Sequence, residues 1–183
     1  MNKFIFLIMA VILSACGSTS SIKNSQKLDG LPNFNNYNVV IVNDFTDGVS
    51  KQGNDPNILA EGKRFADMIV SSIKSKNIFN AVERNVVDSS QHAILIDGRV
   101  IKYDEGNGVM RMLVGFGAGR SHFDAKVNIR DNQTNKSLGL IDVNKCSWLL
   151  GGAIAGSQDI KSHMNSAASK IATECAIAKN RKS

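Results

Sequence analysis

The chain has 183 residues, of which 43% are hydrophobic and 21% are charged, and its formal net charge is +6 at pH 7. This length fits a signal sequence followed by one domain that is large enough to bury its own core. The basic residues are spread along the chain and form no cluster, which argues against a nucleic-acid-binding protein but allows a weak attraction to anionic lipid or peptidoglycan.

The first residues have the features of a bacterial lipoprotein signal peptide. Lys3 precedes an apolar run over residues 4–13, which is too short to cross a bilayer as a helix and is typical of a secretory signal. Residues 13–16 read Leu-Ser-Ala-Cys, which is the pattern of a lipobox. Cleavage after Ala15 would free the amine of Cys16 for acylation, and its thiol would carry diacylglycerol. Several acyl chains on one residue make a stable membrane anchor.

The signal peptide therefore predicts a domain organisation and a location. Residues 1–15 would be removed, and residues 16–36, which are polar and show no periodicity, would form a flexible lipidated tether. Residues 37–179 would form a single periplasmic domain. Gly17 follows the lipidated Cys16, and in enteric-type bacteria an Asp at that position retains lipoproteins in the inner membrane. By resemblance to that rule, we expect anchoring in the outer membrane, facing the periplasm.

The first regular elements of the domain are predicted to be a buried strand and an amphipathic helix. The β-branched run over residues 39–42 indicates a strand within residues 38–45. Asp55 and Pro56 are typical of a helix N-cap and first helical residue, and Asn77 is suited to a left-handed turn that stops the helix. One stripe at helical spacing would cover a sheet; it consists of Phe65, Ala66, Met68, Ile69, Ser72 and Ile73.

A run of strands is predicted next. Residues 81–84 indicate a short strand, and residues 93–103 indicate a longer one in which Gly98 could form a bulge. Residues 109–115 predict another strand.

The clearest strand covers residues 121–130, where apolar and polar side chains alternate strictly, so one face should be packed and the other wet. A polar loop and a partner strand over residues 137–143 would complete a hairpin.

A last helix is predicted from a cap at Ser157 to Lys179. This order predicts the α/β class, with a mixed, largely antiparallel sheet and two main helices packed on it. The buried stripe of the last helix would be Ile160, Met164, Ala167, Ala168, Ile171 and Cys175.

Two apolar glycine-rich stretches, residues 115–119 and 151–156, are the most unusual segments. The first precedes a strand and lacks the lysine of a P-loop, which argues against a nucleotide site; Arg111 and Arg120 flank it and could hold an anion. Its glycines would let two backbone segments pass closely. Because a hairpin returns the chain to its starting end, both stretches should lie at one end of the sheet. The two stretches would form a surface for self-association or for a partner, or they would insert into the membrane. The residues of this surface would be Gly115, Phe116, Gly117, Gly119, Arg120, Gly151 and Gly152.

Cysteines and histidines give little sign of chemistry. Cys146 and Cys175 remain after lipidation and could form a disulfide in an oxidising compartment; two buried free thiols are the alternative. No C-x-x-C motif occurs, and no histidine stands at ligand spacing from them, so no metal or cofactor is predicted. His92, His122 and His163 stand in no nucleophile pattern. We therefore expect a protein that is not an enzyme.

The sequence resembles a bacterial lipoprotein family known only as a domain of unknown function. The resemblance rests on the lipobox, the strand over residues 39–42, the glycine motif that leads into a strand ending at Asp131, and the glycine pair before the last helix. The order of elements is also distantly similar to three other proteins. They are the periplasmic domain of the curli-secretion channel lipoprotein, the amino-terminal domain of the Tol-system periplasmic protein, and the lipoprotein activators of penicillin-binding proteins.

These resemblances imply a role in envelope assembly or transport. We therefore expect a lipid-anchored envelope protein that binds or helps assemble another envelope component. Its partners would be the membrane, through the anchor, and another envelope protein or further copies of itself, with no nucleic acid. Two alternatives stay open: a subunit of an oligomeric secretion or transport assembly, and an enzyme that acts on a periplasmic or cell-wall substrate.

Lipidation can be tested at a single residue. The substitution Cys16→Ser removes the thiol that would carry the lipid, so it should abolish incorporation of labelled palmitate and release the protein from membranes. Labelling and membrane sedimentation of cells that express the variant would measure both effects. A variant that still takes up label and sediments with membranes would contradict the prediction.

Overall fold

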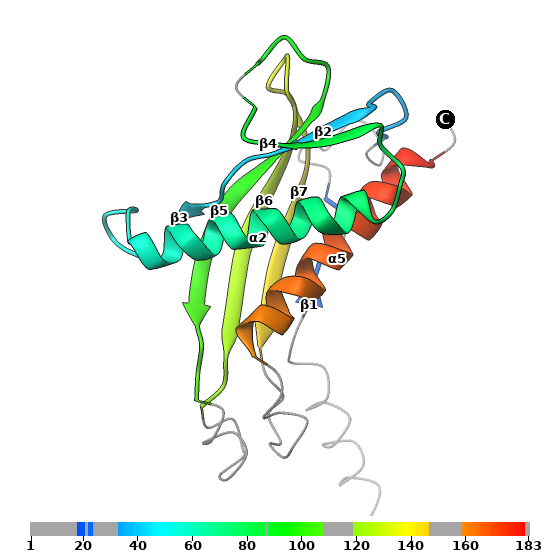
Figure 1. The fold of residues 1–183 in the computed structure, drawn as a ribbon. Coiled ribbons are helices and arrows are strands. Elements are labelled where there is room, and N and C mark those ends of the chain that lie inside the picture. Colours follow the sequence, from blue (N-terminus) through cyan, green and yellow to red (C-terminus); the bar gives the residue numbers. More distant parts are fainter. Residues whose placement is uncertain are drawn as a thin grey trace, which may run out of the picture.

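A computed structural model of the chain describes residues 18–20, 22–23, 33–86, 88–107, 119–146 and 159–181. In this part of the chain, one sheet is covered on one face by two helices (Figure 1). The helices are α2 (Pro56–Lys74) and α5 (Ile160–Lys179). The strands are β1 (Ser18–Thr19), β2 (Val39–Val42), β3 (Thr46–Asp47), β4 (Ala81–Arg84), β5 (Ile94–Asp104), β6 (His122–Asp131) and β7 (Ser137–Cys146).

The strands lie in the order β1-β7-β6-β5-β2-β4, and β3 also pairs with β5. The long strands β5, β6 and β7 are antiparallel neighbours. The short strands β2 and β3 each pair in parallel with β5, and β4 pairs in parallel with β2. This arrangement confirms the predicted α/β class with a mixed, largely antiparallel sheet. The strand expected over residues 109–115 lies outside the described residues. Neither of the two helices described here combines the length and the apolar character that crossing a membrane requires.

Helix α2 begins as the sequence predicts. The side chain of Asp55 accepts hydrogen bonds from the backbone N–H groups of Asn57 (2.8 Å) and Ile58 (3.4 Å), and Pro56 is the first helical residue. These bonds satisfy donors that have no partner inside a helix. The helix ends at Lys74, and Asn77 adopts a left-handed φ of 52° just beyond it.

Helix α5 begins later than predicted. Asp159 is its N-cap, and the Asp159 carboxylate accepts a hydrogen bond of 2.7 Å from the backbone N–H of Ser162. The predicted cap at Ser157 is therefore wrong, since the helix starts at Ile160. The predicted inward stripe is confirmed, because all of its members are buried: Ile160, Met164, Ala167, Ala168, Ile171 and Cys175.

The segment expected to be a flexible tether joins the fold at several described points. Ser18–Thr19 pairs with β7, and Lys23 forms a bridge with Leu140. Ile22 and Phe34 are 8% and 0% exposed. The assignment of residues 16–36 to a tether is therefore corrected for these residues. An unpaired edge of β7 and two apolar side chains would otherwise face water, which is unfavourable.

A second correction concerns β5. Gly98 pairs in regular register with Val127, and the irregularity lies instead between Val100 and Lys102. Gly98 has a packing role: a Cβ atom there would lie 2.1 Å from the carbonyl oxygen of Lys126. Gly98 therefore lets two strands approach closely because it has no side chain, and it forms no bulge.

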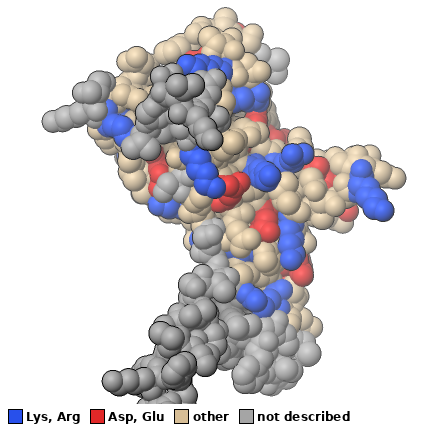
Figure 2. All heavy atoms as spheres, turned by 180° about the vertical axis from the view of Figure 1, so that it is seen from behind, with Lys and Arg blue, Asp and Glu red and all other residues tan. Residues whose placement is uncertain are grey.

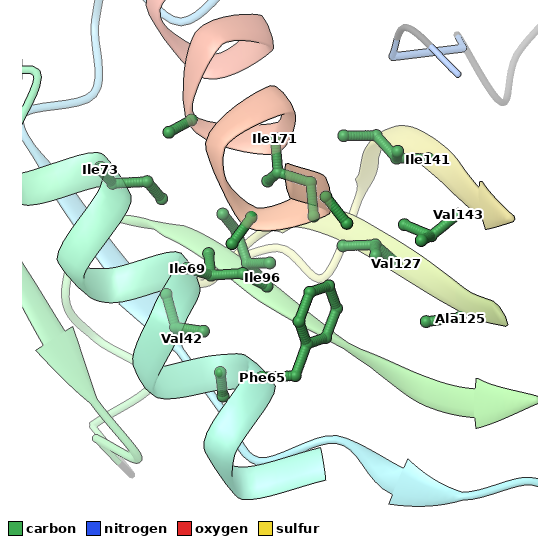
Figure 3. Close-up of a cluster of buried hydrophobic side chains, with 14 of the residues drawn as sticks. Val42, Phe65, Ile69, Ile73, Ile96, Ala125, Val127, Ile141, Val143 and Ile171 are labelled. Atoms are coloured by element: carbon green, nitrogen blue, oxygen red, sulfur yellow. The ribbon is translucent and has the colours of Figure 1, made fainter. Parts of the chain in front are cut away.

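The core lies between the sheet and the two helices. Figure 3 shows Phe65, Ile69 and Ile73 from α2 meeting Ile171 from α5 above side chains of the strands. Aromatic rings extend this contact: the ring of Phe65 lies edge-on to Phe45 and to Phe123, with centroids 5.0 and 4.9 Å apart. Such edge-to-face contacts add to the stability gained from apolar burial.

The opposite face of the sheet is polar. Along β6, the side chains of Asp124, Lys126, Asn128 and Arg130 point away from the helices, in the alternation that the sequence predicts. Figure 2 views the molecule from the side opposite the helices and shows basic and acidic side chains interspersed on it. We call this side the open face.

The packing of α2 can be tested at Gly62, a buried residue in the helix interior. In an unhindered helix, replacing Gly by Ala raises the free energy of unfolding by about 1 kcal/mol. Here the new Cβ would lie 2.3 Å from the carbonyl oxygen of Phe45, so we expect Gly62→Ala to lower the free energy of unfolding by about 1–3 kcal/mol. Urea denaturation measures this change.

The matched control is Ser71→Ala, on an exposed position of the same helix, which should change the free energy of unfolding by less than about 0.5 kcal/mol. A stabilised Gly62→Ala variant would mean that α2 does not pack this closely against Phe45.

Candidate functional site

Two residues of the surface predicted from the glycine stretches lie within the described structure, at the end of the sheet where β5 and β7 finish and β6 begins. Asp104 pairs with His122, and His122 pairs with Cys146. The segments before β6 and after β7 therefore leave the described structure at one end, as the hairpin predicts. Gly119 and Arg120 lie at this end. The other residues of the predicted surface lie outside the described residues: Gly115, Phe116, Gly117, Gly151 and Gly152.

Two backbone segments pass closely at this end. Gly106 and Gly119 both have positive φ angles, 65° and 64°. The backbone N–H of Asn107 donates a hydrogen bond of 2.8 Å to the carbonyl oxygen of Gly119. A Cβ on Gly106 would lie 2.4 Å from that oxygen. Gly106 therefore permits the close approach to the backbone at Gly119, because it carries no side chain.

These segments border a hollow of about 420 Å³, which we call the end hollow. Lys102, Arg120 and His122 bring basic groups to it, and Asp104 brings a carboxylate. Asp104 accepts a hydrogen bond of 2.9 Å from the backbone N–H of Gly106. Arg120 lies 2.9 Å from the sulfur of Cys146. The end hollow therefore offers mixed charge for binding. Arg111, the other arginine that flanks the glycine motif, lies outside the described residues.

The three histidines lie in different surroundings. His92 stacks on the ring of Tyr37 with centroids 4.8 Å apart, and His122 lies 3.1 Å from a carboxylate oxygen of Asp124. His163 lies 3.1 Å from the hydroxyl oxygen of Ser121, a contact that the sequence did not predict. Tertiary packing of α5 on β6 brings these two residues together.

The contact between Ser121 and His163 resembles a nucleophile beside a base, but it is buried. Ser121 is 0% exposed and His163 is 7% exposed. A catalytic nucleophile must be reached by its substrate, and this hydroxyl faces the interior. The pair joins the start of β6 to the first turns of α5. Within the described residues, no group of three or more His, Cys, Asp or Glu side chains could hold a metal ion.

The predicted disulfide between Cys146 and Cys175 is not formed, because Cys175 is a free, fully buried thiol. Burial, together with the nearby charge of Glu174, raises the pKa of Cys175 to about 12. Cys146 pairs with His122, whose neighbour Ser121 contacts His163 at the start of α5. Cys175 lies twelve residues after His163 on the same helix, which is about 18 Å along its axis. A disulfide needs Cα atoms within about 7 Å.

Comparison with known proteins gives one family and a shared fold. The profile of a family described as a domain of unknown function, DUF4410, matches residues 18–151. No curated protein matches the chain.

Two solved structures of PelC dodecamers from Paraburkholderia phytofirmans are similar to the chain. One has a TM-score of 0.61 at 12% identity, covering 91% of this chain and 99% of that chain. The other, a single-substitution variant, has a TM-score of 0.60 at 10% identity, with coverage of 86% and 96%. Protein XCC0632 from Xanthomonas campestris matches at a TM-score of 0.45 and 10% identity, with coverage of 78% and 85%. At these identities, the PelC structures show a shared fold alone.

The state of Cys175 predicts a pattern of alkylation. Because the thiol is buried and its pKa is raised to about 12, iodoacetamide should leave Cys175 unmodified in the folded protein at mildly alkaline pH. After unfolding in urea without a reducing agent, the same thiol should be fully modified. Mass spectrometry of the peptide that contains Cys175 distinguishes the two states. A peptide linked from Cys175 to Cys146 would contradict the structure.

Proposed function

We propose that this chain, which belongs to the DUF4410 family, is a lipid-anchored envelope protein that acts by binding. In this proposal, several copies associate with one another, and the assembly engages another envelope component. The observation that carries the proposal is the fold shared with PelC, which forms a dodecamer and whose fold extends over 91% of this chain.

The position of β1 supports a role for the lipid anchor in this assembly. Ser18 pairs with Asn144 and Thr19 with Val143, in antiparallel register. Going back from Thr19 to Ser18, the chain therefore runs toward the end of β7. Only Gly17 separates the described strand from Cys16, and an extended chain spans at most about 3.6 Å per residue. A lipid on Cys16 would hold the end of the sheet that carries the end hollow close to the membrane.

Anchoring would also favour association. Proteins confined to one membrane with the same end turned toward it meet at a raised effective concentration and in similar orientations. Closed rings form when one surface of a subunit binds a different surface of the next. Catalysis is no part of the proposal: the buried contact between Ser121 and His163 fits a structural role.

The stoichiometry of the protein tests this proposal. The full chain, cross-linked in intact cells and then extracted in detergent, should give a discrete oligomer of many copies, measured by native mass spectrometry. Cross-linked products should contain the chain itself, with or without a second envelope protein. The variant Cys16→Ser is the matched control, because it keeps the domain but loses the proposed anchor, and its yield of oligomer should fall. A chain that stays monomeric under the same cross-linking would overturn the proposal.

A further inference from the structure

The open face holds a second hollow, which arises where the chain leaves β2. The backbone N–H of Asn43 still donates to the carbonyl of Ile96 at 2.9 Å, but the side chain of Phe45 then turns into the core. The chain rejoins the sheet at Thr46, which pairs with Arg99. The segment between them forms one wall of a hollow of about 440 Å³ over the middle of β5 and β6. This volume is within the range of small-ligand sites. We call it the open-face hollow.

Both carboxylates at this hollow already have cationic partners. Asp44 forms an ion pair with Arg84, and Asp97 forms an ion pair with Arg130. Asp97 also accepts a hydrogen bond of 3.0 Å from the side chain of Asn128. Although partial burial acts in the opposite direction, hydrogen bonds from Arg84 and its neighbour Asn85 hold the pKa of Asp44 below its usual value. The negative charges of the hollow are therefore largely compensated within the fold.

The two cations at this hollow are not compensated. Arg99 and Lys126 are exposed and directly opposite each other in the antiparallel pair of β5 and β6. Neither forms an ion pair with any other described residue. At such a position the Cβ atoms lie about 5 Å apart, and like charges there destabilise a sheet. An anion bound between the two side chains would relieve this repulsion.

The remaining polar groups suit hydroxyl groups on the same ligand. The side-chain oxygen of Asn43 is buried and has no hydrogen-bond partner within the described residues. Such an orphaned acceptor is unfavourable, and a small rotation of the Asn43 side chain, which is only partly buried as a whole, would let its oxygen accept a hydrogen bond from a ligand hydroxyl. Thr46 offers a hydroxyl, which donates to the carbonyl of Gly98 at 3.3 Å. Among the described residues, no aromatic or large apolar side chain lines the hollow, whereas the centre of a protein-protein interface is rich in them.

We propose that the open-face hollow binds an acidic saccharide, whose carboxylate lies between Arg99 and Lys126 and whose hydroxyl groups bond to Asn43 and Asn128. The guanidinium of Arg99 can donate two parallel hydrogen bonds to a carboxylate, and Lys126 adds a point charge. The hollow lies on the open face, away from the end of the sheet near the proposed anchor. This inference does not depend on the proposed self-association.

Calorimetric titration of the full chain in detergent with oligogalacturonate tests the proposal. The carboxylated oligomer should bind, and its affinity should fall as salt rises. Its methyl-esterified form, which has the same sugar but no charge, should not bind. The substitutions Arg99→Gln and Lys126→Gln should each weaken binding by at least about tenfold. Because they remove a repulsion, neither should lower the melting temperature, so loss of binding cannot be attributed to unfolding.

The matched control is Lys161→Gln, which removes one charge from an exposed position on α5 and should leave binding unchanged. The proposal is overturned if oligogalacturonate does not bind, or if Lys161→Gln weakens binding as much as Lys126→Gln. Polyglutamate that binds as tightly as the acidic saccharide would also overturn it, in favour of an acidic protein partner. The oligomeric state is measured separately, so failure here would leave the proposed assembly intact.

Discussion

The position of Phe45 is the constraint on which much of the structure depends. Its backbone meets α2 at Gly62, and its ring meets β5 at Gly98, and at both places a Cβ atom would collide with it. The ring of Phe45 contacts Phe65, and Phe65 in turn contacts Phe123, so one aromatic chain joins the helix layer to β6. Because the backbone must leave the sheet to insert this ring, the same segment also forms a wall of the open-face hollow. Core packing and a candidate binding site thus share one cause.

The two helices lie on one face of the sheet, and no helix of the described residues covers the other face (Figure 1). A sheet with one packed face and one wet face separates two tasks: the packed face supplies stability through apolar burial, and the wet face can carry groups chosen for binding. Arg99 and Lys126 illustrate this freedom, since their repulsion would be hard to tolerate in the core. A third region, the end of the sheet, carries the close glycine contact and adjoins the proposed lipid anchor.

Much of the fold could be predicted from the sequence because its signals are local. The cap of α2 at Asp55, the strict alternation along β6 and the inward stripe of α5 depend on residues only a few positions apart. The patterns that predict a lipobox and a signal peptide are also local, and they are the basis for the proposed anchoring at Cys16. Strands of two residues, such as Ser18–Thr19, carry too few side chains to give any periodicity.

What the sequence by itself determined is therefore the class of fold, most of its elements and the candidate anchor. Only the tertiary structure decided which distant residues meet, because this depends on strand register and on the path of α5 across the sheet. It placed Cys175 far from Cys146, brought His163 to Ser121, and put Arg99 opposite Lys126. Register is set by the packing of whole strands and helices, and a shift of one residue would turn each side chain to the other face. No pattern within a short stretch of sequence contains that information.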